Sequence, residues 1–163
     1  MTEAGLDPAG FRRAMQRIPT AVTVVTATGP DGPAGLTANA VVSLSLEPPL
    51  MLACIDRGSR TLRAVEAAGR FGISVLGAGD GEIARAFATK APQEEKWAGV
   101  AWKTVADVPV LEDAEVRVAC ELENAIAGGD HMIVTGVVLE VEASNGPPLV
   151  FYDGAYRPLP DPR

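Results

Sequence analysis

Residues 35–61 read GLTANAVVSLSLEPPLMLACIDRGSRT, and the pattern of this stretch decides the predicted fold. From Gly35 to Leu46, apolar residues alternate with mostly small and polar ones, which is the period of a β-strand. Glu47-Pro48-Pro49 ends this strand, because proline cannot donate a hydrogen bond to a sheet, and Leu50 to Ile55 predicts another strand. We therefore expect one long strand over 35–46, followed directly by a second.

The two faces of the expected long strand differ in character. One face carries only apolar residues, which are Leu36, Ala38, Ala40, Val42, Leu44 and Leu46. The other carries Thr37, Asn39, Val41, Ser43 and Ser45. An ordinary solvent face would carry Lys, Glu or Arg, whereas hydroxyl and amide groups suit hydrogen bonds to a neutral, planar ligand with polar edges. A solvent face with unusually small side chains is the alternative, and the spacing alone does not decide between the two.

The rest of the chain is also rich in strands. Further strands are expected over 21–28, 71–76, 116–126, 131–142 and 149–152, and helices over 8–18, 59–68 and 80–88. Residues 89–113 show no regular pattern and are expected to be irregular. Long strands joined by turns, with a few short helices, predict a mainly β fold, an antiparallel barrel of about six or seven strands.

The length and the net charge of the chain limit the classes of protein to which it can belong. The chain has 163 residues, which suits a single domain over 1–163. Its formal net charge of −7 disfavours a nucleic-acid partner, which requires a basic face. The N-terminal segment lacks the apolar region of a signal peptide, and no apolar run is long enough to span a bilayer. We therefore expect a soluble, cytoplasmic protein that does not bind a membrane.

The motifs exclude several kinds of enzyme site. His131 is the single histidine, and Cys54 and Cys120 form no CxxC pair, so we expect no metal site and two reduced packing cysteines. No phosphate-binding GxxxxGK[ST] and no GxSxG occur. Residues 71–86 combine a strand, glycines and a helix, but Glu82 stands where a dinucleotide-binding turn needs its third glycine. We interpret that segment as an ordinary loop before a helix.

Two further segments carry polar groups that suit a site. Residues 54–61 leave a strand and enter a helix, whose first N–H groups, with Ser59, Thr61 and either Arg57 or Arg60, suit a phosphate. His131 follows Gly-Gly-Asp at the start of a strand. The alternatives are an ordinary helix cap and a surface histidine, and the residues alone leave both open.

Taken together, these segments resemble the flavin reductase-like family, whose fold is the FMN-binding split barrel. The matching pieces run in the family's order over about residues 11–157, and they are PTAVTVVTA at 19–27, GLTANAVVSLSLEPPLMLACIDRGSRT at 35–61, FGISVL at 71–76, ARAFA at 84–88, GGDHMIVTGVVLEV at 128–141 and PLVFYDGAYR at 148–157. Ala21 departs from the pattern, because the family often has glycine there, and this leaves the choice between FMN and FAD open.

The resemblance implies where a flavin and a nicotinamide would bind. The residues implied to line the isoalloxazine and ribityl side of the flavin are Thr37, Ala38, Asn39, Ser43 and Ser45. Those implied along the ribityl-phosphate are Asp56, Ser59 and Thr61, with Phe87 near the flavin from the helix that follows. His131 takes the catalytic position beside the nicotinamide, with Tyr156 nearby.

The function implied by the resemblance is that of an NAD(P)H-dependent flavin reductase. Such an enzyme transfers hydride from NADH or NADPH to FMN or FAD, and supplies the reduced flavin to a partner monooxygenase. A homodimer is also expected, because the strands 116–126 and 131–141 carry apolar residues on both faces. The alternatives are a non-catalytic flavin-binding protein and a pyridoxamine-phosphate-oxidase-like enzyme on a related barrel, and the Gly-Asp-His block with SLSLEPPL favours the reductase.

Overall fold

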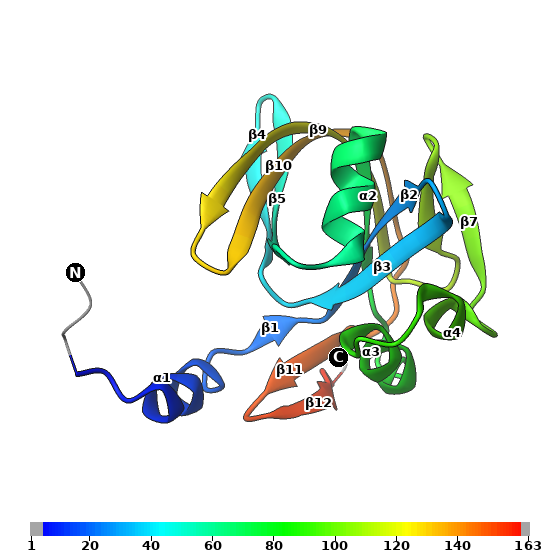
Figure 1. Ribbon diagram of the computed structural model, residues 1–163. Coiled ribbons are helices and arrows are strands. Elements are labelled where there is room, and N and C mark those ends of the chain that lie inside the picture. The colour runs from blue at the N-terminus through cyan, green and yellow to red at the C-terminus, as the bar shows by residue number, and fades with distance from the viewer. Residues whose placement is uncertain (1–4, 161–163) are drawn as a thin grey trace.

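The computed structural model describes residues 5–160, and its centre is an antiparallel seven-stranded sheet (Figure 1). The order across the sheet is β3-β2-β6-β9-β10-β5-β4. The strands are β2 (Thr23–Gly29), β3 (Gly32–Ala38), β4 (Val41–Leu46), β5 (Pro49–Asp56), β6 (Arg70–Val75), β9 (Val116–Gly128) and β10 (His131–Ala143). The expected mainly β fold with a few short helices is confirmed.

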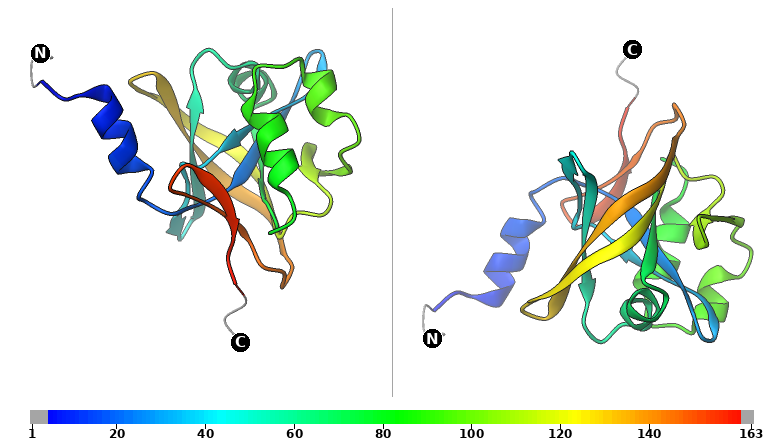
Figure 2. Two further views of the ribbon diagram at one scale, coloured as in Figure 1. Left: turned by 90° about the horizontal axis from the view of Figure 1, so that it is seen from below. Right: turned by 90° about the horizontal axis from the view of Figure 1, so that it is seen from above.

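The two edge strands of this sheet, β3 and β4, follow each other directly along the chain. Only Asn39 and Ala40 lie between them, so both edges must come together at this corner. The backbone N–H of Cys54 on β5 donates to the carbonyl of Ala40 at 2.9 Å and ties the corner to the sheet. The sheet is therefore strongly curved, as its long strands show from above in Figure 2.

This corner corrects the prediction of one uninterrupted strand over 35–46. The alternation of residue types continues through Asn39 and Ala40, but the backbone leaves one edge of the sheet and joins the other. The apolar face of the expected strand is therefore split. Ala38 is buried on β3, whereas Val42, Leu44 and Leu46 on β4 are 53%, 46% and 89% exposed. An alternating sequence predicts that a strand has two different faces, but it does not predict whether each face contacts the core, a ligand or solvent.

Two smaller sheets flank the large one. The first contains β1 (Thr20–Ala21), β11 (Leu149–Tyr152) and β12 (Ala155–Pro158), and the second is the hairpin of β7 (Trp102–Val105) and β8 (Val108–Leu111). The expectation that residues 89–113 are irregular is wrong, because they hold this hairpin and the short helix α4 (Gln93–Trp97). Each of these elements has only four or five residues, so the periodicity within 89–113 was too weak to reveal them.

The longer helices begin where their capping residues predict. Asp7 accepts hydrogen bonds from two backbone N–H groups at the start of α1 (Pro8–Met15), and Ser59 accepts one from Leu62 at the start of α2 (Arg60–Ala68). The remaining helix is α3 (Gly81–Ala88). α1 buries none of its residues and lies to one side of the molecule in Figure 1. Within residues 5–160, no helix has the length and apolar character needed to cross a bilayer.

Two clusters of buried side chains hold the elements together. The first packs α2 through Leu62 and Val65 against the sheet, where it meets Phe71. The second packs α3 and α4 through Phe87 and Trp97, whose rings meet edge to face at 5.1 Å. These clusters fix the first turn of α2 and the last turn of α3 relative to β3, and these are the elements that surround the site.

Candidate active site

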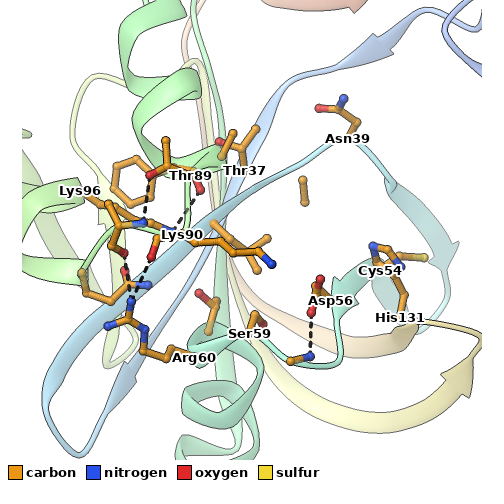
Figure 3. Close-up of a pocket in the computed structure, with 18 of the residues that line it drawn as sticks. Thr37, Asn39, Cys54, Asp56, Ser59, Arg60, Thr89, Lys90, Lys96 and His131 are labelled. Atoms are coloured by element: carbon orange, nitrogen blue, oxygen red, sulfur yellow. Dashed lines mark hydrogen bonds between the residues drawn. The ribbon is translucent and has the colours of Figure 1, made fainter. Parts of the chain in front are cut away.

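A cavity of about 670 Å³, called the main cavity below, opens between β3, β5, the start of α2, the end of α3 and the β11–β12 hairpin (Figure 3). Its volume is typical of a small-molecule site. Nine of the residues predicted for the site line it, and they are Thr37, Ala38, Asn39, Asp56, Ser59, Thr61, Phe87, His131 and Tyr156. Residues from both the N-terminal and the C-terminal half of the chain therefore line the same cavity.

Ser43 and Ser45, which were also predicted for the site, are not among the residues that line the main cavity. Both lie on β4, beyond the corner at Asn39 and Ala40, where Ser43 is exposed and Ser45 is half-buried. The prediction grouped them with Thr37 and Asn39 because it assumed a single strand. In this chain the corner separates Ser43 and Ser45 from Thr37 and Asn39.

Two side-chain oxygens of residues that line the main cavity are buried and have no hydrogen-bond partner among the described residues. They are the Oδ1 atom of Asn39 and the Oγ1 atom of Thr61. Leaving such an atom unpaired costs about 1–3 kcal/mol, so a native fold pairs it with a ligand or water. A flavin carries polar groups of the kind that pair with such oxygens: an isoalloxazine edge with hydrogen-bond donors, and a ribityl-phosphate chain. The residues present therefore fit the cofactor that the resemblance implies.

Gly35 fixes the position of the wall opposite α2. A Cβ atom at this glycine would lie 2.7 Å from the Cε1 atom of Phe87, so a larger residue would push α3 away from β3. Its backbone N–H donates to Gln93 Oε1 at 2.9 Å, and its carbonyl accepts from Gln93 Nε2 and from Lys96 Nζ, each at 3.3 Å. β3, α3 and α4 are thereby held together, and Thr37 adds a 2.6 Å hydrogen bond to the Ala84 carbonyl.

One end of the main cavity is cationic. Arg60, Arg63, Lys90 and Lys96 line it near the first turn of α2, and Figure 3 shows three of them gathered on one side. Lys96 is only 6% exposed, and its burial, together with the nearby Arg60, lowers the pKa of its ammonium group. Cations beside the N-terminus of a helix form an environment suited to a phosphate.

The two arginines between which the sequence did not decide have different positions. Arg60 lines the main cavity, and its guanidinium donates to the carbonyls of Lys90 and Ala91 at 3.4 and 3.1 Å. Arg57 does not line it, and its guanidinium donates to the carbonyl of Gly129 in the β9–β10 turn at 3.1 Å. Arg60 is therefore the member of the pair that can reach a ligand in the cavity.

His131 lies at the opposite end of the main cavity from the cations (Figure 3). It is the first residue of β10 and pairs in register with Asp56 of β5. Its Nδ1 atom lies 2.7 Å from Oδ1 of Asp130, and this hydrogen bond is the main cause that lowers the pKa of the Asp130 carboxyl. Because Nδ1 is held by Asp130, Nε2 is the ring nitrogen that is left to interact with a ligand.

Some residues of the main cavity were not predicted. Cys54, expected to be a packing residue, is half-buried and lines the cavity beside His131. The signal was present, since Cys54 and Asp56 stand two residues apart on one strand and therefore share a face. Phe151 enters from the β11–β12 hairpin, where its ring meets that of Tyr156 at 5.5 Å. Arg63, Lys90, Gln93 and Lys96 come from α2 and from the segment after α3, whose path the sequence did not predict.

Comparisons with known proteins identify the family of this chain. The family model of the flavin reductase like domain matches residues 15–160. The reductase subunit HsaB of a flavin-dependent monooxygenase from Mycobacterium tuberculosis is 36% identical, with 94% of this chain and 83% of that protein covered. A flavin reductase (NADH) from Kitasatospora aureofaciens is 38% identical, with 97% and 86% covered.

A solved structure shares the fold over nearly the whole chain. The NADH:FAD oxidoreductase SgcE6 of Streptomyces globisporus, in complex with NAD and FAD fragments, superposes with a TM-score of 0.88 at 31% identity. The superposition covers 96% of this chain and 94% of that one. The sequence resemblance, the match to the family model and the shared architecture lead to the same conclusion: this chain belongs to the flavin reductase-like family.

Proposed function

We propose that this chain is an NAD(P)H-dependent flavin reductase that binds FMN or FAD in the main cavity. The observation that carries the proposal is the pair of unpartnered buried atoms, Asn39 Oδ1 and Thr61 Oγ1, on residues that line a cavity with a cationic end. When bound, the flavin supplies the chemistry, because it accepts a hydride from the reduced nicotinamide. The protein must bind and align the two reactants.

Each part of the main cavity has a separate task in this proposal. Asn39 and the backbone of Thr37 and Ala38 hold the polar edge of the isoalloxazine. Ser59, Thr61 and the first N–H groups of α2 hold the phosphate, with Arg60 as counter-charge. Phe87 supports the floor of the cavity from α3, where it is fully buried.

His131 and Tyr156 are assigned to the nicotinamide. The hydrogen bond from His131 Nδ1 to Asp130 holds the imidazole in one orientation at the end of the cavity away from the phosphate. Tyr156 is fixed by its contact with Phe151 and by the Arg85 guanidinium, which lies 5.7 Å from its ring centre. Neither side chain needs to accept or donate the hydride, so their role is alignment.

We assign the reduced flavin to a partner monooxygenase and the protein to the cytoplasm. The relative HsaB is named as the reductase subunit of a flavin-dependent monooxygenase, which supports such a partner here. The family match over residues 15–160 supports one functional domain. A cytoplasmic location agrees with the supply of reduced nicotinamide that the reaction consumes.

A homodimer is also part of the proposal. Six apolar side chains are exposed on β4, β9 and β10, which are Val42, Leu44, Leu46, Ile126, Leu139 and Val141. In the sheet order these strands are separated only by β5. α1 adds Phe11 and Met15, 50% and 44% exposed, on a helix that buries none of its residues. Apolar faces of this extent favour burial against a second copy.

Steady-state oxidation of NADH and NADPH in the presence of FMN, FAD and riboflavin tests the catalytic proposal. We expect oxidation that rises with added flavin. If a flavin binds but neither nicotinamide is oxidised with any of the three, the chain is a flavin-binding protein and the reductase proposal is wrong.

A further inference from the structure

A second cavity, of about 560 Å³, adjoins the main cavity. The two share Arg60, Arg63 and Gln93 as lining residues, so they are neighbours on either side of these three side chains. The second cavity lies between the β2–β3 turn, the side of α2 and the start of α4. The proposed function gives this cavity no role, because the isoalloxazine and the flavin phosphate are both assigned to the main cavity.

The walls of the second cavity suit a flat, weakly polar ring. Three proline rings and three alanine methyl groups line it, and they are Pro30, Pro33, Pro92, Ala34, Ala64 and Ala67. Such walls are apolar and small, and they favour stacking of a planar base. Two carboxylates, Asp31 and Glu94, complete the lining. Carboxylates accept hydrogen bonds from ribose hydroxyls and repel a phosphate attached to one of them. These walls therefore select a nucleotide whose ribose hydroxyls carry no further phosphate.

The shared side chains supply positive charge where the cavities meet. Arg63 is exposed and makes no hydrogen bond or ion pair with the part of the chain that the structure describes, 5–160. Arg60 keeps part of its guanidinium available, since only its Nη2 atom donates to the protein. The chain as a whole is acidic, with a net charge of −7, yet two neighbouring arginines lie between the two cavities. They are the counter-charge that a pyrophosphate requires.

We infer that the second cavity binds the adenosine monophosphate half of FAD, and that this chain therefore prefers FAD to FMN. The inference rests on the proposed flavin site. The second cavity adjoins the main cavity at Arg60 and Arg63 of α2, the helix whose first turn is assigned to the flavin phosphate, whereas His131 lies on the other side of the main cavity from Arg60 (Figure 3). The adenylate that continues from this phosphate belongs to the flavin, whereas that of the nicotinamide starts from the His131 end.

The decisive variant is Ala67→Phe. Ala67 is exposed on α2 and lines the second cavity but not the main one, so a phenyl group there fills the space without touching the main cavity. Ala68→Phe is the matched control, because Ala68 is exposed on the same helix and lines neither cavity. The dissociation constants of FAD and FMN are measured by titration without any nicotinamide, and the KM for NADH is measured separately with FMN.

For the wild type and for Ala68→Phe we expect FAD to bind about tenfold or more tightly than FMN. In Ala67→Phe we expect the FAD constant to rise to within about twofold of the FMN constant, which itself does not change. Equal affinity for both flavins in the wild type, or an Ala67→Phe variant that keeps the preference for FAD, overturns the inference. A higher KM for NADH with unchanged flavin constants also overturns it, and assigns the second cavity to the nicotinamide dinucleotide. Because the titrations contain no NADH, their result is independent of whether the chain is a reductase.

Discussion

The segments on either side of Asn39 and Ala40 carry the same alternating pattern but have opposite surroundings. On β3, Thr37 and Ala38 face the main cavity and the core around it. On β4, only a few residues later, Leu44 and Leu46 are exposed on the outer strand. The sequence of the two segments does not explain the difference. The position of each strand in the sheet does, because β3 and β4 are opposite edges that meet only at the corner.

One continuous sequence pattern can therefore serve two functions. The β3 segment is built against its own chain and presents polar groups to a ligand. The β4 segment presents apolar groups that its own chain does not cover, which agrees with the proposed contact to a second copy. The four predictions below test this division, from the largest expected effect to the smallest.

Leu44→Asp should have the largest effect, because it places a charge in the apolar face of β4. We expect the dimer to weaken by at least about 100-fold, since burying an unpaired carboxylate is strongly unfavourable. Light scattering at micromolar concentration should then give a mass near the 16.9 kDa of one chain, against twice that value for the wild type. Thr104→Asp on the distant β7 strand is the control and should stay dimeric. A wild type that is already monomeric contradicts the proposed role of β4.

Asn39→Leu tests the β3 side of the comparison. Leucine cannot pair with the flavin edge, and loss of this hydrogen bond should weaken flavin binding by about 1–3 kcal/mol, which is roughly 5- to 150-fold. Ser43→Ala, beyond the corner, should change the dissociation constant by less than about twofold. Equal losses at both positions would show that β4 reaches the flavin as well, as an uninterrupted strand would require. Flavin titration of the two variants, with circular dichroism to verify the fold, measures the difference.

His131→Ala tests the other end of the main cavity. The variant should bind flavin nearly as well as the wild type, because His131 lies away from the phosphate end. Its kcat/KM for NAD(P)H should fall by roughly 10- to 100-fold, the scale of lost reactant alignment. Wild-type kcat/KM over a pH series would remove His131 from the mechanism and leave it as a surface residue of the β9–β10 turn.

The smallest effect concerns Cys120, a core-facing cysteine, in contrast to the cavity-facing Cys54. Burial raises the pKa of the Cys120 thiol from 9.0 to about 12. Above pH 9 the unfolded chain therefore loses this proton while the folded chain keeps it, so stability falls as pH rises. From about pH 9 to 10 the free energy of unfolding should fall by about 1 kcal/mol through this thiol.

Denaturant titrations at both pH values measure this slope. Cys120→Ala should lose this part of the pH dependence, whatever its absolute stability, whereas Cys54→Ala should keep it because Cys120 is still present. An unchanged slope in Cys120→Ala would mean that the thiol ionises equally easily in the folded and unfolded chains.

Much of the site was predictable because it depends on local signals. Asp7 and Ser59 identified the helix starts, since a cap is a contact between near neighbours. Asn39, Thr61 and His131 were named through the family resemblance, and the fold brings them to one cavity. Lys96 was not named, because its position depends on α4 packing against Gly35, more than sixty residues earlier in the sequence.

The sequence by itself determined the class of fold, the starts of α1 and α2, and nine of the residues that line the main cavity. Only the tertiary structure decided that the strand over 35–46 breaks at Asn39 and Ala40, that Ser43 and Ser45 leave the cavity, and that Arg60 rather than Arg57 enters it. It also decided that a second cavity adjoins the first through Arg60 and Arg63. The physical reason is the same in each case. Periodicity and capping act between neighbours along the chain, whereas the surroundings of a strand face depend on contacts between segments far apart in sequence.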